Sequence, residues 1–540
     1  MLDPACGDGG LLKAVADAMP PALRERLSLT GFDTDERALA QAESVLKESG
    51  AAALHLDHAD FLSIISAEHT DAQMDLLFTL RKPDSIKITS RFHAVISNPP
   101  YVRTQVLGAA AARELATRFG LTGRVDMYHA FVKAMTLALD DQGILALLTS
   151  NRFLSVQSGS SMRDWMSEHF QLLRLVDLGD TKLFEAAVLP AVLVAKRSTA
   201  KPERECEFIR VYETNERVNA NVRDVGSILE VADGVFAGVA RADDVCFQVE
   251  TGRLQMGADG RTPWTMSNDG VDSWLTTVKA NSAGTFGDVA KVCVGIKTTA
   301  DSVFIRDDWD FLPEQERPEN ELLHPLVTHH RATRWHLPAT SLETKRVLYP
   351  YVMASDDRTP VDLADYPRAR AYLLKHRERL ESRNYVIESG RQWFEIWVPH
   401  RPKDWTRPKL AFPDISETSR FFFVDEGWIV NGDCYWTKLL PGKDVSWLSL
   451  MLAVANSSFA MKFYDTVFHN KLYSGRRRFM SQYVSRFPLP KIGRAKDIIA
   501  IMPRVLKASS EQNTDELERL QEQLDGLVWK AFGLRKEIAR

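Results

Sequence analysis

Length, composition and charge exclude several classes of protein. The chain has 540 residues, of which 45% are hydrophobic and 26% charged; this is too long for one ordinary core, so we expect two or three domains. No apolar run reaches the roughly 18 residues of a membrane span, and no signal peptide opens the chain. Five cysteines without paired spacing favour a reducing cytoplasm, with neither disulfides nor a zinc site. With a formal net charge of −4, any basic face must be local.

A glycine-rich loop opens the chain. Asp3-Pro4-Ala5-Cys6-Gly7-Asp8-Gly9 precedes a predicted helix over residues 11–19. Glycines let the backbone approach a ligand closely, and the start of a helix offers free N–H groups. A predicted strand over 27–32 then ends at Asp33, about 20 residues past the loop, where nucleotide-binding folds place an acid for ribose hydroxyls.

The next predicted unit is a helix over 38–49 and a strand over 54–62 that carries Asp60 and Phe61 at its end. Asp60 is suited to accept from an adenine amino group, and the ring of Phe61 to lie on the base. A single Asp at such a place is more often a helix cap or a turn residue. The recurrence of acids at successive strand ends favours a nucleotide site.

The stretch that carries the most chemistry is a buried strand over 92–97 that stops at Asn98-Pro99-Pro100-Tyr101. Prolines cannot donate to a sheet and hold the preceding residue extended, so this corner is stiff. The Asn98 side-chain oxygen and the Pro99 carbonyl can both accept from one exocyclic amine, and Tyr101 offers an aromatic face. In open α/β sheets, ligands lie at the carboxyl ends of strands. The alternative is a proline-rich turn that only ends the strand.

Alternating elements continue to about residue 198. We expect helices over 104–119, 127–139 and 161–170, and strands over 144–150, 172–180 and 188–196. Together they predict an α/β fold with a doubly wound sheet. Phe184 lies in a short polar loop between the last two strands, and from the sequence alone it is more typical of a core residue.

After residue 198 the pattern changes. We assign 1–200 to the first domain, 201–245 to a transition, 246–490 to a second domain rich in aromatic and basic residues, and 491–540 to C-terminal helices. The basic run that contains Lys471, Arg476, Arg477 and Arg478 is suited to hold phosphates. The alternative is a solvated charged loop. His329 and His330 lack partners at metal-ligand spacing, so we predict no metal site.

With these pieces in place, the chain resembles the gamma-class adenine-N6 DNA methyltransferases of bacterial restriction–modification systems (TaqI-like). Asp3 to Gly9 resembles their first S-adenosylmethionine motif, and Asn98-Pro99-Pro100-Tyr101 matches their catalytic motif. Similar phrases recur later: Gly295-Ile296-Lys297-Thr298, Asn456-Ser457-Ser458 and Phe487-Pro488-Leu489-Pro490. The resemblance implies a class I S-adenosylmethionine-dependent methyltransferase domain, Rossmann-like, followed by a mixed α+β target-recognition domain.

The resemblance also implies an activity and a set of roles. S-adenosyl-L-methionine would methylate N6 of an adenine flipped out of duplex DNA, without a metal. The cofactor would be held by Asp3, Pro4, Gly7, Gly9, Asp33, Asp60 and Phe61. The target base would be held by Asn98, Pro99, Pro100 and Tyr101, with Phe184 on its far face. DNA phosphates would be held by Lys471, Arg476, Arg477 and Arg478. The implied partners are double-stranded DNA and a cognate restriction endonuclease, in a bacterial cytoplasm at the nucleoid.

The start of the chain departs from the family, which usually has a helix and a full first strand before the glycine loop. We therefore expect either a start codon called too late or another polypeptide that supplies this segment. Three alternatives stay open: a protein-glutamine methyltransferase, since the hook also fits a carboxamide; an RNA methyltransferase; and a catalytically impaired DNA-binding remnant.

Overall fold

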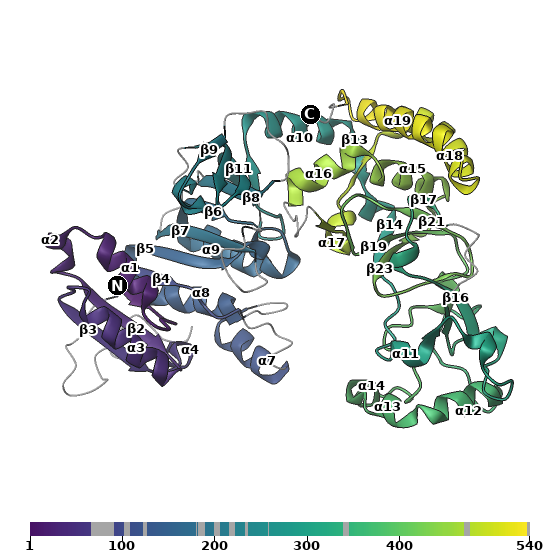
Figure 1. The fold of residues 1–540 in the computed structure, drawn as a ribbon, viewed down its shortest axis with the longest axis horizontal. Helices are drawn as coiled ribbons and strands as arrows, with labels where there is room; N and C mark the ends of the chain where they lie inside the picture. The colour runs from purple at the N-terminus through teal and green to yellow at the C-terminus, as the bar shows by residue number, and fades with distance from the viewer. Residues whose placement is uncertain are drawn as a thin grey trace. The chain divides into compact units, whose positions relative to one another are not determined.

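The structure divides into two compact units, Met1–Asp269 and Gly270–Arg540 (Figure 1). It is a computed structural model that describes residues 1–65, 91–101, 109–121, 127–179, 181, 189–198, 206–214, 222–232, 236–257, 259–337, 345–468 and 476–536. The division lies later than the 201–245 transition expected from the sequence, because the strands from β8 (Glu207–Glu213) onward continue the sheet of the first unit.

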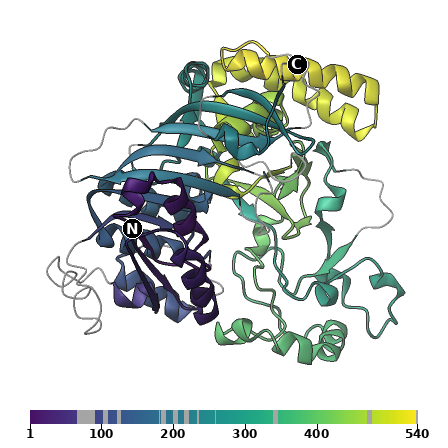
Figure 2. The same ribbon diagram turned by 60° about the vertical axis from the view of Figure 1, so that its left-hand side comes forward.

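The first unit is built on a 12-stranded sheet, whose neighbouring strands Figure 2 shows side by side in purple to teal. Its order is β3-β2-β1-β4-β5-β7-β6-β8-β11-β10-β9, with β12 paired to β11. The strands are β1 Leu2–Asp3, β2 Ser28–Asp33, β3 Ala53–His58, β4 Phe92–Ser97, β5 Leu139–Ser150, β6 Phe170–Asp177, β7 Pro190–Arg197, β9 Val222–Asp224, β10 Gly238–Ala242, β11 Val245–Gln255 and β12 Thr265–Ser267. From β3 to β5 the pairs are parallel, and β7 runs antiparallel to β5 and β6. This order confirms the doubly wound, Rossmann-like sheet expected of a class I methyltransferase.

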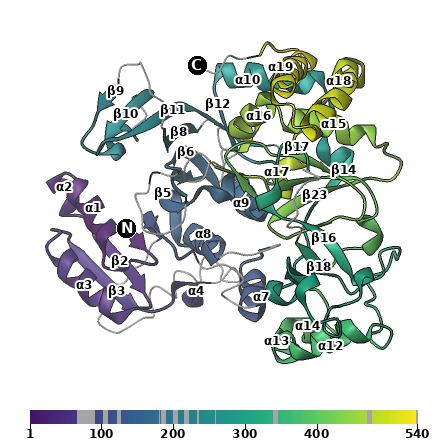
Figure 3. The same cartoon turned by 45° about the vertical axis from the view of Figure 1, so that its right-hand side comes forward.

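Helices cover both faces of the parallel part. The described helices of this unit are α1 Gly10–Ala18, α2 Pro21–Arg24, α3 Glu36–Lys47, α4 Phe61–Ile64, α7 Ala109–Arg118, α8 Met127–Ala138 and α9 Ser160–His169. On one face, α1 and α3 contribute Leu12 and Leu46 to a core with Leu29 of β2. On the other, α8 packs Phe131 against a core that contains Val95 of β4. Figure 3 shows α3 beside β3 and α8 beside β5. Because both faces are covered, the central strands are mostly apolar, which is why they were recognisable in the sequence.

The third strand differs from its prediction. Residues 54–62 were expected to be one strand, but β3 ends at His58 and the short helix α4 begins at Phe61. The cause is local: Asp60 is the N-cap of α4, and its side chain accepts from the backbone N–H of Leu62.

The second unit combines small sheets with helices. Its strands are β13 Ser282–Thr285, β14 Ala290–Val294, β15 Ile305–Arg306, β16 Leu323–Val327, β17 Trp335–His336, β18 Arg346–Leu348, β19 Lys409–Pro413, β20 Ile415–Ser416, β21 Phe422–Val424, β22 Ile429–Val430, β23 Cys434–Leu439, β24 Arg477–Arg478 and β25 Pro488–Pro490. Its helices are α10 Asp269–Asn281, α11 Asp301–Phe304, α12 Pro367–Lys375, α13 Arg377–Glu381, α14 Asn384–Glu388, α15 Ser446–Ala455, α16 Ser458–Phe468, α17 Ser481–Val484, α18 Ile492–Ser510 and α19 Thr514–Ala531.

The last two helices form an antiparallel pair, yellow in Figure 1. Leu520, Leu524 and Val528 of α19 are buried in the largest core cluster of this unit, as their helical spacing predicted. Among the described residues, no helix is both long enough and apolar enough to cross a bilayer.

Candidate active site

A cavity of about 740 Å³ lies in the first unit, where the carboxyl ends of β1, β2 and β4 meet. Residues predicted for the site that line it are Pro4, Asp33, Asp60, Phe61, Asn98 and Pro100. Asp3, Gly7, Gly9, Pro99 and Tyr101 do not line it, although each lies within a few residues of one that does. The fold therefore joins the glycine loop to the proline hook, which are about 90 residues apart in the chain.

The glycine loop has backbone conformations that other residues adopt only with strain. Gly7 and Gly9 have φ values of 52° and 80°. The N–H of Gly7 donates to Asp33 Oδ2 at 2.8 Å, so Asp33 holds the loop against the end of β2. A Cβ on Gly7 would meet nothing within 4 Å, whereas one on Gly9 would lie 3.0 Å from Leu46. Asp33 therefore fixes the loop against the end of β2, and the space next to the Cα atom of Gly7 is open.

Asp3, at the end of β1, is fully buried. The N–H of Ala5 donates to its Oδ1 at 3.1 Å. Burial raises the pKa of this carboxyl from 3.8 to about 7, against hydrogen bonds from the N–H of Ala5 and the Ser97 hydroxyl that lower it, and the charge of Asp33 raises it further. Asp3 therefore lies behind the loop, beside the Ser97 hydroxyl, and not on the cavity wall. The open glycine loop, with a carboxyl group directly behind it, fits a cofactor with a cationic amino end.

Asp60 and Phe61 combine a structural role with a place in the cavity. Besides capping α4, Asp60 lines the cavity. Phe61 is buried between Phe32, at a centroid distance of 5.5 Å, and Phe131, at 6.3 Å. Phe131 of α8 also lines the cavity, and the sequence analysis gave it no role. Its only signal was its place in the apolar helix predicted over residues 127–139.

The proline hook presents its side chains as its residue types predict. Ser97 and Pro99 are buried, Asn98 is exposed and Tyr101 is half-buried. The Tyr101 hydroxyl lies 2.9 Å from Asn98 Oδ1 and 3.1 Å from the carbonyl oxygen of Leu148, so its single proton is shared between two acceptors. Burial raises the pKa of Tyr101 to about 12, which keeps this hydroxyl protonated. The ring of Tyr128 packs edge-on against Tyr101 at 6.5 Å. The corner is therefore held rigidly beside the cavity.

Two predicted site residues cannot be placed. Phe184 and Lys471 lie outside the described residues.

The basic run is largely engaged in internal ion pairs. Arg477 donates to both carboxylate oxygens of Asp465, at 2.7 and 2.6 Å. Arg478 pairs with Asp414 at 3.0 Å. Arg476 lies 3.9 Å from Glu417, and both of these side chains are exposed. Of the three arginines, Arg476 alone is held loosely enough to keep its charge available to a phosphate.

We expect Arg477→Gln to affect stability more than DNA binding. The change leaves the Asp465 carboxylate without its bidentate partner, at a cost of about 1–3 kcal/mol in the free energy of unfolding. Urea unfolding would measure this loss, with Arg476→Gln as the matched control that leaves stability nearly unchanged. A tenfold loss of DNA affinity in Arg477→Gln without a loss of stability would contradict this role.

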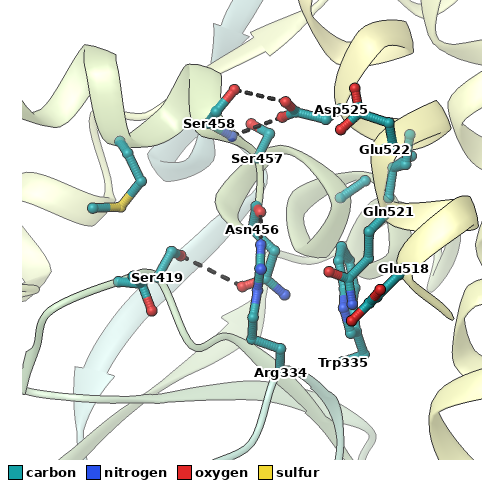
Figure 4. A pocket seen from close by; sticks show the side chains of 14 residues that line it. Arg334, Trp335, Ser419, Asn456, Ser457, Ser458, Glu518, Gln521, Glu522 and Asp525 are labelled. Atoms are coloured by element: carbon teal, nitrogen blue, oxygen red, sulfur yellow. Dashed lines mark hydrogen bonds between the residues drawn. The ribbon is translucent and has the colours of Figure 1, made fainter. Parts of the chain in front are cut away.

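The segment Asn456-Ser457-Ser458 lines a cavity of about 340 Å³ in the second unit, and its side chains form hydrogen bonds to other segments (Figure 4). The Asn456 side chain accepts from the N–H of Phe421 and donates to its carbonyl. The N–H and hydroxyl of Ser458 both donate to Asp525 of α19 at 2.7 Å. Glu518, Glu522 and Asp525 line this cavity against one cation, Arg334, which disfavours a phosphate there. The three residues therefore serve as internal connections: Asn456 holds the backbone of Phe421, and Ser458 joins α16 to α19.

Comparisons with known proteins agree with this architecture. Residues 25–184 match the family model described as Eco57I restriction-modification methylase. Over 541 aligned residues the chain is 35% identical to the Type II methyltransferase M.BanIII of Aneurinibacillus aneurinilyticus, covering 99% of this chain and 91% of that protein. It is 24% identical to the Type II methyltransferase M.BstVI of Geobacillus stearothermophilus, covering 83% of this chain and 74% of that one. The structure of the Type IIL restriction-modification enzyme MmeI in complex with DNA is similar in fold, with a TM-score of 0.62, 14% identity, and coverage of 100% of this chain and 70% of that one.

Proposed function

The chain belongs to the type II DNA methyltransferases of restriction–modification systems, and we propose that it methylates N6 of an adenine flipped out of duplex DNA. S-adenosyl-L-methionine is the methyl donor. This membership favours DNA over the protein-glutamine and RNA substrates that the hook alone left open. A cognate restriction endonuclease that cuts the same site is the partner we expect.

One observation carries the proposal: the exposed Asn98 lies in the same cavity as the nucleotide-type residues Asp33, Asp60 and Phe61. The Asn98 side-chain oxygen and the Pro99 carbonyl are two acceptors for one exocyclic amine. A pair of acceptors on an amine draws its lone pair out of conjugation with the ring, so the nitrogen becomes a better nucleophile. Tyr101, fixed by its hydroxyl and by Tyr128, offers its ring for stacking, which is worth about 1–3 kcal/mol per base.

We assign the following roles to the residues of the site. S-adenosyl-L-methionine would supply an activated methyl group on a sulfonium. Asp3 and the glycine loop would hold its amino end, Asp33 its ribose hydroxyls, and Asp60 and Phe61 its adenine. Asn98 and the Pro99 carbonyl would hold the target amine so that its nitrogen takes the methyl group, the carbon–sulfur bond breaks, and the proton that the nitrogen loses goes to solvent. The hook then acts mainly by positioning and electrostatics.

The test is the identity of the modified base. Plasmid DNA incubated with the purified protein and S-adenosyl-L-methionine would be digested to nucleosides and analysed by mass spectrometry, and sequenced at single-molecule level for the motif. We expect N6-methyladenine at one recurring sequence. N4-methylcytosine would contradict the adenine assignment, and label confined to protein or RNA would contradict the DNA substrate.

A further inference from the structure

A second cavity, of about 300 Å³, lies in the second unit and is strongly cationic. Its lining includes Lys291 of β14, Lys438 of β23, Arg358 and Arg401, against a single carboxylate, Asp404. These residues come from four places along 148 positions of a chain whose net charge is −4. The fold thus places four cations around one cavity, although the chain as a whole carries a net negative charge.

Strand pairing makes this arrangement costly. β14 and β23 are antiparallel neighbours, and their register places Lys291 opposite Lys438. Like charges directly opposite each other in an antiparallel pair are destabilising. Asp404 compensates only one of them, through a 2.6 Å ion pair with Lys438. Within the described part of the chain, the side chains of Lys291, Arg358 and Arg401 form no ion pair shorter than 4.0 Å.

Asp356, which pairs with Lys403 at 2.6 Å, also interacts with the charge of Arg401, and the two remaining titratable groups beside the cavity are neutral. His400 Nε2 donates to the Val294 carbonyl oxygen at 2.8 Å, and burial lowers the pKa of this histidine, so it is neutral. Burial raises the pKa of the Cys293 thiol, the cross-strand neighbour of Trp436, so it is neutral as well. The Trp436 indole N–H donates to the same Val294 carbonyl and is buried, which makes a rigid floor.

We propose that this cavity is an anion site that holds a phosphate of the DNA backbone. Three cations without ion-pair partners on a rigid floor attract a backbone phosphate, which carries one negative charge, and a bound anion would offset the part of the lysine repulsion that Asp404 leaves uncompensated. The inference rests on the proposed function and deepens it, because it places a backbone contact on the second unit. It also supplies a phosphate contact that Arg477 and Arg478, engaged with Asp465 and Asp414, do not provide.

The test is the salt dependence of DNA binding by the full-length protein with Lys291→Gln and Arg401→Gln combined. Each phosphate contact contributes about −0.9 to the slope of log K against log salt concentration. We expect the double variant to lose about one unit of slope and to bind DNA about tenfold more weakly at physiological salt. The single variant Lys291→Gln should melt at the same temperature as wild type or higher, because one like-charge repulsion is removed. Lys496→Gln, exposed on α18, is the matched control and should keep the wild-type slope.

Inorganic tripolyphosphate separates DNA from a free anion as the occupant. Suppose that the double variant keeps the wild-type salt slope of DNA binding, and that tripolyphosphate raises the melting temperature of the wild type but not of the double variant. This result would overturn the DNA assignment in favour of a free anion. An unchanged slope with no tripolyphosphate effect would overturn the site itself. If the wild type neither binds nor methylates DNA, the proposed function fails. If the double variant methylates DNA normally and keeps the wild-type salt slope of DNA binding, only this inference is refuted.

Discussion

Asn98→Ala is expected to lower the methylation rate at least 10²–10³-fold, the range seen when one preorganised polar group is removed from a transition state. The variant loses one of the two acceptors that activate the target amine. DNA affinity should change little, since Asn98 contributes to the chemistry and not to the hold on the duplex. Single-turnover methylation with tritiated S-adenosyl-L-methionine measures the rate, and a filter or fluorescence assay measures binding.

Two controls sharpen this result. Asn98→Asp keeps side-chain acceptors and should retain more activity than Asn98→Ala. Asn384→Ala, exposed at the start of α14 in the second unit, should behave as wild type. Wild-type turnover by Asn98→Ala would remove the catalytic assignment of the hook and, with it, the physical basis of the adenine proposal.

Asp3→Asn is expected to weaken cofactor binding about tenfold or more and to stabilise the ligand-free protein above pH 7. The folded-state pKa of about 7 lies above the unfolded value of 3.8. The folded protein therefore holds a proton that the unfolded chain loses between about pH 4 and pH 7, and stability falls as pH rises through this window. Three pKa units correspond to about 4 kcal/mol at most. The asparagine variant lacks this pH-dependent loss.

Calorimetric titration with S-adenosyl-L-methionine and melting temperatures from pH 4 to 8 would check both parts. Asp17→Asn, exposed on α1 outside the loop, is the matched control. Asp3 is fully buried and does not line the cavity. If Asp3→Asn leaves the cofactor affinity unchanged, Asp3 does not hold the cofactor and only positions the loop through the N–H of Ala5. Melting temperatures with the same pH dependence in both proteins would contradict the burial argument.

Much of the first unit was predictable because its signals are local. The strands β2 and β4 and the helices α1, α3 and α8 follow from apolar periodicity within single segments. The end of β3 was missed because one side-chain hydrogen bond, from the N–H of Leu62 to Asp60, starts a helix there. The strands β8 to β11 were missed as part of the sheet because nothing in residues 201–245 specifies their partner: β8 pairs with β6, more than 30 residues earlier.

The sequence also shows where charged residues lie along the chain, but it does not show which of them form ion pairs. The sequence presented residues 471–478 as one basic run, but Asp414 and Asp465, which pair with Arg478 and Arg477, are 64 and 12 residues away. The cations of the second cavity are separated by tens of residues and share no motif. A sequence shows how many charges a chain carries, and only the folded chain decides which of them meet.

The amino-acid sequence by itself determined the proline corner and the glycine loop, because proline and glycine restrict or free the backbone at their own positions. It also determined the family, through motifs that extend over most of the chain. Only the tertiary structure decided that Asp3 is fully buried, that Arg477 and Arg478 are paired internally, and that Lys291 faces Lys438. These are properties of neighbours in space, and burial and partners set the energy of a charge far more than its place in the chain does.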